Sequence, residues 1–435
     1  RQLPAGVVDS GFASLAGFVV ALAAVSLFND VDRGVYAIFF TAFVVGTLLS
    51  NELIFTPAEI EAVSYPTPER LSLVPQSLRL GVGPALAGTL AAPVAVAVTA
   101  SYATAEVAIP LAVTSGISMV LSPMQDHVRR MLHIAELSWK AASVSLVQFL
   151  VVAATIGVGL AVDVPEAWLP FGALAIANAV SLTFARVLAQ FSIREHASGK
   201  LRFRKLAAIG AWYVLNAAPA VVWFAVAAII AWLASPEELG YSVSARVVAQ
   251  TILVFTTGLT AVLTPLAMRA AMDRDLTSAR KTRTTFLGSM FVVGVVYVAV
   301  AGWDWVLNPM ALIVPSAYEL SGLVAFTILA NMATSAAFLQ SDELAGARRE
   351  RLLAAISWLS SVFVLAGGAT ASVTGAFARP LAGVAGAAAR YVAQARALVP
   401  VYGSTDEATD APPDDANAAG QDPNRAGPIQ PPHQP

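Results

Sequence analysis

The sequence predicts an all-α polytopic membrane protein, and three observations carry that prediction. Of the 435 residues, 57% are hydrophobic and only 12% are charged, whereas soluble domains carry about 25% charged residues. The apolar residues are grouped into runs as long as a helix that crosses a bilayer, roughly 20 residues. The basic residues gather in alternate connections between these runs. So little charge cannot cover a soluble surface of this size, which excludes a soluble enzyme.

About twelve apolar segments are long enough to be transmembrane helices. They are expected at residues 10–28, 34–54, 79–100, 104–124, 141–162, 168–189, 206–233, 240–266, 285–302, 318–339, 352–371 and 376–398. Backbone amides find no hydrogen-bond partner in lipid, so helices are the economical structure for runs of this length. A transmembrane barrel would show alternating segments of about ten residues, and the sequence lacks them.

The distribution of Lys and Arg predicts that both termini are cytoplasmic. With the N-terminus inside, the inner connections contain eighteen basic residues: Arg70, Arg79, Arg129, Arg130, Lys140, Arg194, Lys200, Arg202, Arg204, Lys205, Arg269, Arg274, Arg280, Lys281, Arg283, Arg348, Arg349 and Arg351. The outer connections contain two, Arg33 and Arg379. This imbalance follows the positive-inside rule. Residues 126–140, which mix charges with apolar residues, are expected to form an inner loop helix or a helix along the inner leaflet.

A short motif that occurs twice indicates an internal duplication. Residues 29–37 read NDVDRGVYA and residues 235–242 read SPEELGYS, and each acidic turn reaches a glycine, Gly34 or Gly240, within two residues of a tyrosine. A weaker echo links the segments that follow Gln125 and Gln340. Two six-helix halves related by an axis along the membrane normal would follow. The alternative is that short Gly-Tyr turns recur by chance.

The expected domain organisation follows from this duplication and from changes in composition. An N-terminal six-helix bundle covers residues 1–192, a basic cytoplasmic linker covers 193–205, and a C-terminal six-helix bundle covers 206–400, with a central cavity between the two bundles. Residues 401–435 are rich in Asp, Pro, Ala and Gln, and this composition predicts a disordered cytoplasmic tail.

At these residues the sequence resembles a known family of exporters. The turn with Gly34-Val35-Tyr36-Ala37, its partial repeat at residues 239–242 and the pattern of Gln125, Asp126 and Arg129 are similar to the multidrug/oligosaccharidyl-lipid/polysaccharide (MOP) exporter superfamily. The bacterial polysaccharide, or Wzx-like, flippase branch is the nearest resemblance. The second turn departs from the Gly-x-Tyr-Ala order.

The resemblance implies a function, a location and partners. It implies a flippase in a bacterial inner membrane that moves a polyprenyl-diphosphate-linked glycan from the inner to the outer leaflet by alternating access. Membrane lipids and a polysaccharide polymerase or other envelope-assembly proteins are the implied partners. Three alternatives stay open: a cation-coupled multidrug exporter of the same superfamily, a membrane glycosyltransferase or polymerase that uses a lipid-linked sugar, and a non-transporting scaffold.

Arg246 is the first candidate for a substrate-binding residue. A diphosphate that crosses about 30 Å of hydrocarbon needs fixed positive charge in a wet cavity. An arginine near the centre of a spanning helix costs about 2.5–3.5 kcal/mol, so it should face a cavity or a partner. A guanidinium group also matches phosphate oxygens bidentately. The alternative is that Arg246 reaches the outer interface or pairs with Glu237 or Glu238.

Four further residues complete the predicted substrate-binding site. Arg33 holds the position in the first half that corresponds to Arg246 and would assist at the cavity mouth, unless it pairs with Asp30 or Asp32. Gln250 follows Arg246 by one helical turn. Gln250, Asn178 and Asn216 are uncharged polar groups within spans, which would bind sugar hydroxyls or form interhelical hydrogen bonds.

Pro219 lies within the seventh span, where it is expected to bend the helix and act as a hinge.

Several kinds of chemistry have no residues to support them. The chain has no cysteine, four histidines without a His-x-x-x-His pair, and no P-loop sequence. We therefore expect no metal site, no cofactor and no enzymatic activity. The net charge of −2 does not favour nucleic acid.

Overall fold

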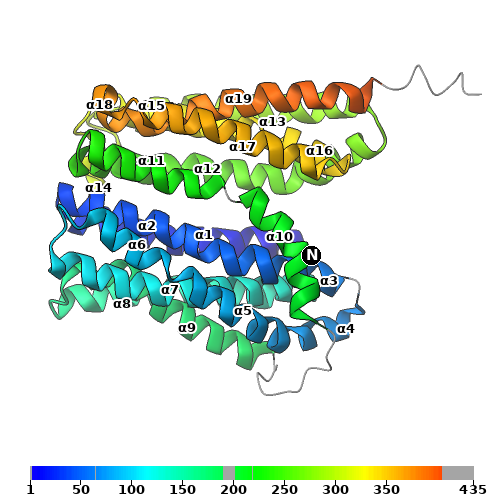
Figure 1. Ribbon diagram of the computed structural model, residues 1–435, viewed down its shortest axis with the longest axis horizontal. Helices are drawn as coiled ribbons and strands as arrows, with labels where there is room; N and C mark the ends of the chain where they lie inside the picture. The colour runs from blue at the N-terminus through cyan, green and yellow to red at the C-terminus, as the bar shows by residue number, and fades with distance from the viewer. Residues whose placement is uncertain (1, 64, 190–200, 218, 404–435) are drawn as a thin grey trace, which may run out of the picture.

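The computed structural model describes residues 2–63, 65–189, 201–217 and 219–403. Within these ranges the chain is all-helical and contains no strand. Figure 1 shows the long helices lying side by side in two groups. Helices α1 to α9 form one group and α11 to α19 form the other, with α10 where the two groups meet.

The helices of the first group follow one another with short connections. They are α1 (Gln2–Leu27), α2 (Asp30–Ser50), a π-helical turn (Asn51–Phe55), α3 (Thr56–Val63), α4 (Thr67–Arg70), α5 (Val74–Gly88), α6 (Ala91–Thr99), α7 (Ala105–Ile134), α8 (Ser138–Ala161) and α9 (Leu169–Ala189). The predicted third span is therefore two helices, α5 and α6, divided at residues 89–90.

The second group is built in the same way. Its helices are α10 (Phe203–Ala217), α11 (Pro219–Leu233), α12 (Pro236–Met272), α13 (Leu276–Ala301), α14 (Pro309–Ile313), α15 (Leu323–Ala336), α16 (Phe338–Gly346), α17 (Glu350–Gly368), α18 (Ala371–Thr374) and α19 (Ala378–Tyr402). The predicted seventh span contains α10 and α11, and residue 218 between them lies outside the described residues.

The fold class predicted from the sequence is confirmed. In the described parts of the chain, eleven helical segments are long and apolar enough to cross a membrane. The twelfth predicted span corresponds to α19, which has 25 residues and lies along α17 in Figure 1. It carries Arg379, Arg390 and Arg396, which explains why it is not among the eleven apolar segments. The chain is a multi-pass membrane protein.

Three boundaries predicted from the sequence differ from the structure. The prediction of a separate inner helix at 126–140 is wrong, because α7 continues without a break to Ile134. Residues 203–205 of the predicted linker are the first turn of α10, and 193–200 lie outside the described residues. Of the predicted tail, residues 401 and 402 end α19, and 404–435 lie outside the described residues.

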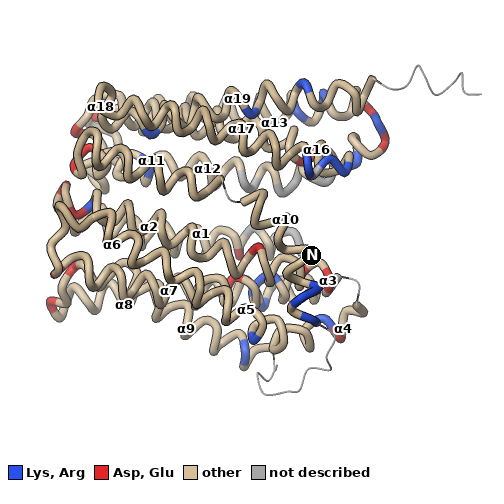
Figure 2. Tube along the Cα trace, viewed as in Figure 1, with Lys and Arg blue, Asp and Glu red and all other residues tan. Residues whose placement is uncertain are grey.

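Basic residues gather at one end of the molecule. Figure 2 shows most Lys and Arg at the end that carries the N-terminus, α3, α4 and α16, with few at the opposite end. We call the basic end the inner end and the opposite end the outer end.

The two repeated turns cap the two helices that join the halves. Asn29 accepts a hydrogen bond from the backbone amide of Asp32 at the start of α2, and Ser235 accepts one from Glu238 at the start of α12. The two helices then pack against each other at their outer ends.

The glycine of each turn makes this contact close. A Cβ atom on Gly34 would lie 2.1 Å from the carbonyl oxygen of Pro236, and one on Gly240 would lie 2.5 Å from the carbonyl oxygen of Asp30. Each glycine thus meets the residue four positions before the other glycine, as expected for two halves related by a pseudo-twofold axis. We call this contact the outer seal.

Candidate functional site

A cavity of about 330 Å³ lies between the two groups of helices. Residues of α2 form one wall, and residues of α11, α12, α15 and α19 form the others. Its described lining residues are Phe40, Thr41, Val44, Ala220, Trp223, Ser242, Arg246, Leu253, Thr327, Ala330, Asn331, Thr334, Phe338, Arg379, Pro380 and Gly383. These residues include two arginines, five hydroxyl or amide side chains, and no carboxylate.

Arg246 points into this cavity, as the sequence predicts. It lies ten residues after the start of α12 at Pro236, which places it about 15 Å from the outer end of that helix, near the middle of a bilayer. Its guanidinium carbon lies 4.7 Å from the centroid of the Phe40 ring on α2, a cation–π contact between the halves. Among the described residues no carboxylate forms an ion pair with it.

Arg379 supplies a second cation that the sequence analysis did not assign to the site. It is the second residue of α19 and lines the same cavity. Its Nη1 atom is buried and has no hydrogen-bond acceptor among the described residues. The guanidinium groups of Arg246 and Arg379 are close enough to repel each other. The hydroxyl of Tyr36, within electrostatic reach of Arg246, is also buried without a hydrogen-bond partner in the described structure.

The turn before α19 holds Arg379 in place. Gly375 has a φ of +54°, a backbone conformation that favours glycine. The carboxylate of Glu238, in the first turn of α12, accepts a 2.7 Å hydrogen bond from the backbone amide of Ala376. Glu238 is therefore engaged with this turn, and it does not form the ion pair with Arg246 that the sequence left open.

Two other predicted site residues have structural partners. The guanidinium group of Arg33 pairs with Asp30 and donates a 2.8 Å hydrogen bond to the carbonyl of Val25. Arg33 therefore belongs to the outer seal, and it is not a lining residue of the cavity. Asn178 is buried in the first half, where it accepts a hydrogen bond from Gln148 at 2.7 Å and donates one to Ser122 at 2.6 Å. This network joins α7, α8 and α9.

The remaining predicted residues lie near the cavity without lining it. Gln250 is half-buried on α12, one turn after Arg246. The Oδ1 atom of Asn216, near the end of α10, is buried without a hydrogen-bond donor in the described part of the chain. Pro219 is the first residue of α11, directly before Ala220 in the cavity wall. Residue 218 lies outside the described residues, so the bend at Pro219 and its role as a hinge stay predictions.

A different set of buried charges lies at the inner end of the first half. The carboxylate of Asp9 on α1 is 2% exposed and lies 2.8 Å from Arg129 Nη1 and 2.8 Å from His133 Nε2, both on α7. Ser145 of α8 donates to it at 2.5 Å. Arg129 also binds Asp126 at 2.6 Å. We call these residues the inner charge cluster; within the described chain no group of acidic and histidine side chains is arranged to hold a metal.

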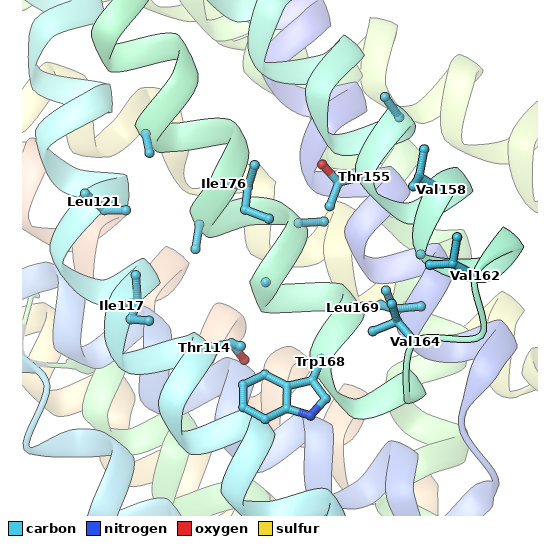
Figure 3. Close-up of a pocket in the computed structure, with 16 residues that line it drawn as sticks. Thr114, Ile117, Leu121, Thr155, Val158, Val162, Val164, Trp168, Leu169 and Ile176 are labelled. Carbon is cyan, nitrogen blue, oxygen red and sulfur yellow. The ribbon is translucent and has the colours of Figure 1, made fainter.

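Two larger hollows are almost wholly apolar. One, of about 740 Å³, lies between α7, α8 and α9 (Figure 3) and is lined by Ile117, Val158, Ile176 and their neighbours. We call it the outer-wall groove, because none of its helices contributes a lining residue to the cavity. The other, of about 440 Å³, lies between α2, the α5–α6 pair and the α10–α11 pair; we call it the lateral groove.

Comparison with known proteins identifies the fold. The sequence matches no protein-family model and no curated protein. Solved structures, in contrast, match over almost the whole chain. The structure of an inward-facing multidrug resistance MATE family transporter of the MOP superfamily has a TM-score of 0.72 at 11% sequence identity, covering 93% of this chain and 100% of that one. This chain has the fold of the MATE transporters.

Two further MATE-fold structures agree. A MOP superfamily transporter from Pyrococcus furiosus has a TM-score of 0.62 at 12% identity, over 92% of this chain and 95% of that one. An outward-facing multidrug resistance MATE family transporter has a TM-score of 0.61 at 11% identity, over 92% and 94%. The inward-facing structure therefore superposes better than the outward-facing one, which agrees with the closed outer seal. The predicted superfamily fold is confirmed, and the flippase branch stays a prediction.

Proposed function

We propose that this protein is a flippase that moves a polyprenyl-diphosphate-linked oligosaccharide from the inner to the outer leaflet by alternating access. The observation that carries the proposal is the pair of arginines in the cavity between the halves. Arg246 and Arg379 are half-buried and have no carboxylate partner in the described structure, although two like charges so placed within a membrane protein are costly. An anionic ligand would neutralise both.

The chemistry of the cavity suits a diphosphate. Two guanidinium groups can each bind phosphate oxygens bidentately, and a diphosphate offers one phosphate to each of them. Asn331, Thr327 and Thr334 add polar side chains of the kind that bind sugar hydroxyls. A volume of about 330 Å³ is at the small end of ligand sites. We therefore assign the diphosphate and the sugar next to it to this cavity, with the remaining glycan in the space that opens between the halves.

A cation-coupled multidrug exporter is the second candidate, and its support is the fold together with the aromatic rings of Phe40, Trp223 and Phe338 in the cavity. An organic cation would be repelled by the two arginines, and no carboxylate among the described lining residues offsets them. The structure from Pyrococcus furiosus is described as having a pocket of reverse polarity that suggests a different function. In this fold, pocket charge is thus a reasonable guide to substrate class, and here it favours an anion.

The topology, boundaries and location belong to the same proposal. A flippase of this kind would lie in a bacterial inner membrane with both termini in the cytoplasm, as the basic residues at the inner end support. Residues 1–192 and 203–402 would be the two bundles that rock against each other, with 193–202 as the linker and 403–435 as the tail. A polysaccharide polymerase would receive the flipped carrier.

The test is a flipping assay in proteoliposomes. The probe is a short-chain polyprenyl diphosphate linked to a sugar that carries a dithionite-quenchable dye, placed in both leaflets. Dithionite added outside should quench only the outer leaflet in empty vesicles and nearly all of the dye in vesicles with the protein. Arg246→Ala should abolish the extra quenching, and Arg246→Lys should retain part of it, because charge survives while bidentate geometry is lost.

The same vesicles separate the alternatives. Uptake of ethidium without flipping of the diphosphate probe would establish the multidrug exporter and reject the flippase. Transfer or polymerisation of the sugar, detected by mass spectrometry, would instead establish a glycosyltransferase or polymerase. If flipping is unchanged in Arg246→Ala and in Arg379→Ala, the protein is still a flippase, but the two arginines are not its substrate-binding site.

A further inference from the structure

The lateral groove lies directly behind the wall of the cavity. Two helices, α2 and α11, separate the two spaces, and they pack against each other. On α2 the cavity is lined by Thr41 and Val44 and the groove by Ala42 and Val45. On α11 the cavity is lined by Ala220 and Trp223 and the groove by Val221 and Phe224. A wall one helix thick, about 10 Å, thus has a charged side and a purely apolar side.

The groove opens towards lipid. The side chains of Leu90, Val94 and Val221 are 67%, 50% and 47% exposed. Its floor is a backbone contact between α2 and α5, where a Cβ atom on Gly88 would lie 2.1 Å from the carbonyl oxygen of Gly46. Small residues therefore hollow the groove between larger apolar walls.

One outer wall of the groove is an interrupted helix. Leu90 lies between the end of α5 and the start of α6, and it lines the groove. The backbone amides of Thr89 and Leu90 bond three residues back instead of four, and tight turns of this kind within a helix often mark a hinge. Val214 of α10 and Val221 of α11 line the other outer wall. The groove therefore has one wall that is able to move.

The groove also lies at a depth in the membrane that suits the chain of a lipid whose headgroup is in the cavity. Phe40 stacks on Arg246 and so marks the level of the cavity cations. Residues 42 to 49 of α2, which line the groove, follow Phe40 by two to nine residues. This places the groove about 3–14 Å from that level towards the inner end. A lipid whose phosphates reach Arg246 would have the first part of its chain at the height of the groove.

We infer that the lateral groove holds the isoprenyl chain of the substrate, next to the diphosphate, and that the chain passes between α2 and α11 while the headgroup is in the cavity. This inference rests on the proposed function and adds the route of the lipid. The outer-wall groove is larger and equally apolar, but none of its helices lines the cavity. It therefore has no access to a chain whose headgroup is bound there.

The experiment uses two photoactivatable probes and the full chain in nanodiscs. One probe is farnesyl diphosphate with a diazirine on its chain, and the other is the matching neutral farnesol. Cross-linked peptides are mapped by mass spectrometry. The diphosphate should label residues 42–49 and 214–224 about tenfold more than the alcohol does, while both probes label the outer-wall groove equally. The excess should disappear in the double variant Arg246→Ala, Arg379→Ala.

A matched pair of variants tests the groove itself. Val221→Trp fills the lateral groove, and Val158→Trp fills the outer-wall groove, where Val158 is 61% exposed. Val221→Trp should lower the diphosphate-dependent labelling roughly tenfold, because it displaces about two methylene groups from an apolar site. Val158→Trp should leave that labelling unchanged. Binding of inorganic diphosphate, followed by calorimetry, should survive both substitutions.

The outcomes separate the route from the function. Suppose that inorganic diphosphate binds in an arginine-dependent way, but the probe labels the outer-wall groove or its labelling is unaffected by Val221→Trp. That result would overturn the inferred route and leave the proposed function standing. Equal labelling of the lateral groove by both probes would identify its occupant as ordinary membrane lipid and also overturn the inference. Absence of diphosphate binding to the unaltered protein, with no headgroup dependence of labelling, would reject the proposed function as well.

Discussion

Half-buried arginines have opposite surroundings in the two halves of the molecule. In the first half Arg129 is bound by the carboxylates of Asp9 and Asp126 at 2.8 and 2.6 Å. In the second half Arg246 and Arg379 share a cavity whose described residues offer no carboxylate. The first arrangement neutralises itself and ties three helices together. The second arrangement leaves two positive charges without an anionic partner from the described chain.

The contrast is between the inner end and the cavity, and not between the halves as such, because charges at the inner end of the second half are also paired. Glu343, which is 0% exposed, receives two hydrogen bonds from the guanidinium group of Arg283 and one from the hydroxyl of Tyr402. Both halves therefore close their inner ends with satisfied charges. Unpaired cations occur at the cavity between the halves, where a substrate would enter. We expect the paired sets to act on stability and the unpaired set to act on binding.

The largest expected effect on stability is at Asp9. Asp9→Ala would remove the acceptor that Arg129 and His133 share and leave a small void in its place. Breaking a buried pair in this way costs about 3–5 kcal/mol. Unfolding in mixed micelles, followed by circular dichroism, should show the loss. An unfolding free energy within about 0.5 kcal/mol of the unaltered protein, the size of a surface substitution, would show that the inner charge cluster does not stabilise the fold.

Replacing the cavity arginines should have the opposite signature. Arg246→Met or Arg379→Met should leave the unfolding free energy unchanged or raise it, because a half-buried charge without a carboxylate partner is replaced by an apolar side chain. Each change should weaken binding of inorganic diphosphate roughly 10- to 150-fold, the value of a hydrogen bond to a charged group. Calorimetry on the proteins used for unfolding gives both quantities. A large loss of stability without loss of binding would make these arginines structural.

The outer seal should respond to a single methyl group. Gly34→Ala would place a Cβ atom 2.1 Å from Pro236, and overpacking of this kind costs about 1–3 kcal/mol. The halves should separate at their outer ends, so that a single cysteine introduced at Thr334 becomes reactive to an impermeant maleimide. The chain has no native cysteine to interfere.

Two glycine variants control this result. Gly240→Ala should behave like Gly34→Ala, because the contact is pseudo-symmetric. Gly83→Ala, where a Cβ atom meets nothing within 4 Å, should leave Thr334→Cys unreactive. Equal labelling in all three variants would show that the outer seal does not control access.

Much of the fold follows from the sequence because its signals are local. Each predicted span contains a long helix or a broken pair, and the repeated turns are the caps that their Asn29 and Ser235 suggest. Arg246 could be identified because an arginine within an apolar run needs a special environment. The charges of residues 126–133 could not be placed, since their partner Asp9 is about 120 residues away in the chain.

The sequence identifies only part of the site, and the reason is again that the missing contacts are non-local. For Asn178 the sequence leaves substrate binding and an interhelical hydrogen bond open, because it does not reveal how a helix is rotated, and the structure shows hydrogen bonds to Gln148 and Ser122. Arg379 was counted as an outer-loop residue because it stands at the start of its span. A signal was present, since it is one of two basic residues in connections that the positive-inside rule keeps free of them. The fold of α19 over the cavity, fixed by Glu238 and the turn at Gly375, is a non-local feature.

The smallest expected loss of stability, and the sharpest test of motion, is at Pro219. Proline has no backbone N–H to donate and alanine favours a helix, so Pro219→Ala should not lower the unfolding free energy. Alanine also removes the residue that the sequence predicts to bend this span, which should slow flipping in proteoliposomes while diphosphate binding stays intact. Pro309→Ala is the matched control, because Pro309 opens a short helix, α14, that contributes no lining residue to the cavity. If Pro219→Ala and Pro309→Ala flip the probe at the same rate, Pro219 is not a hinge, and the opening of the halves must take place elsewhere.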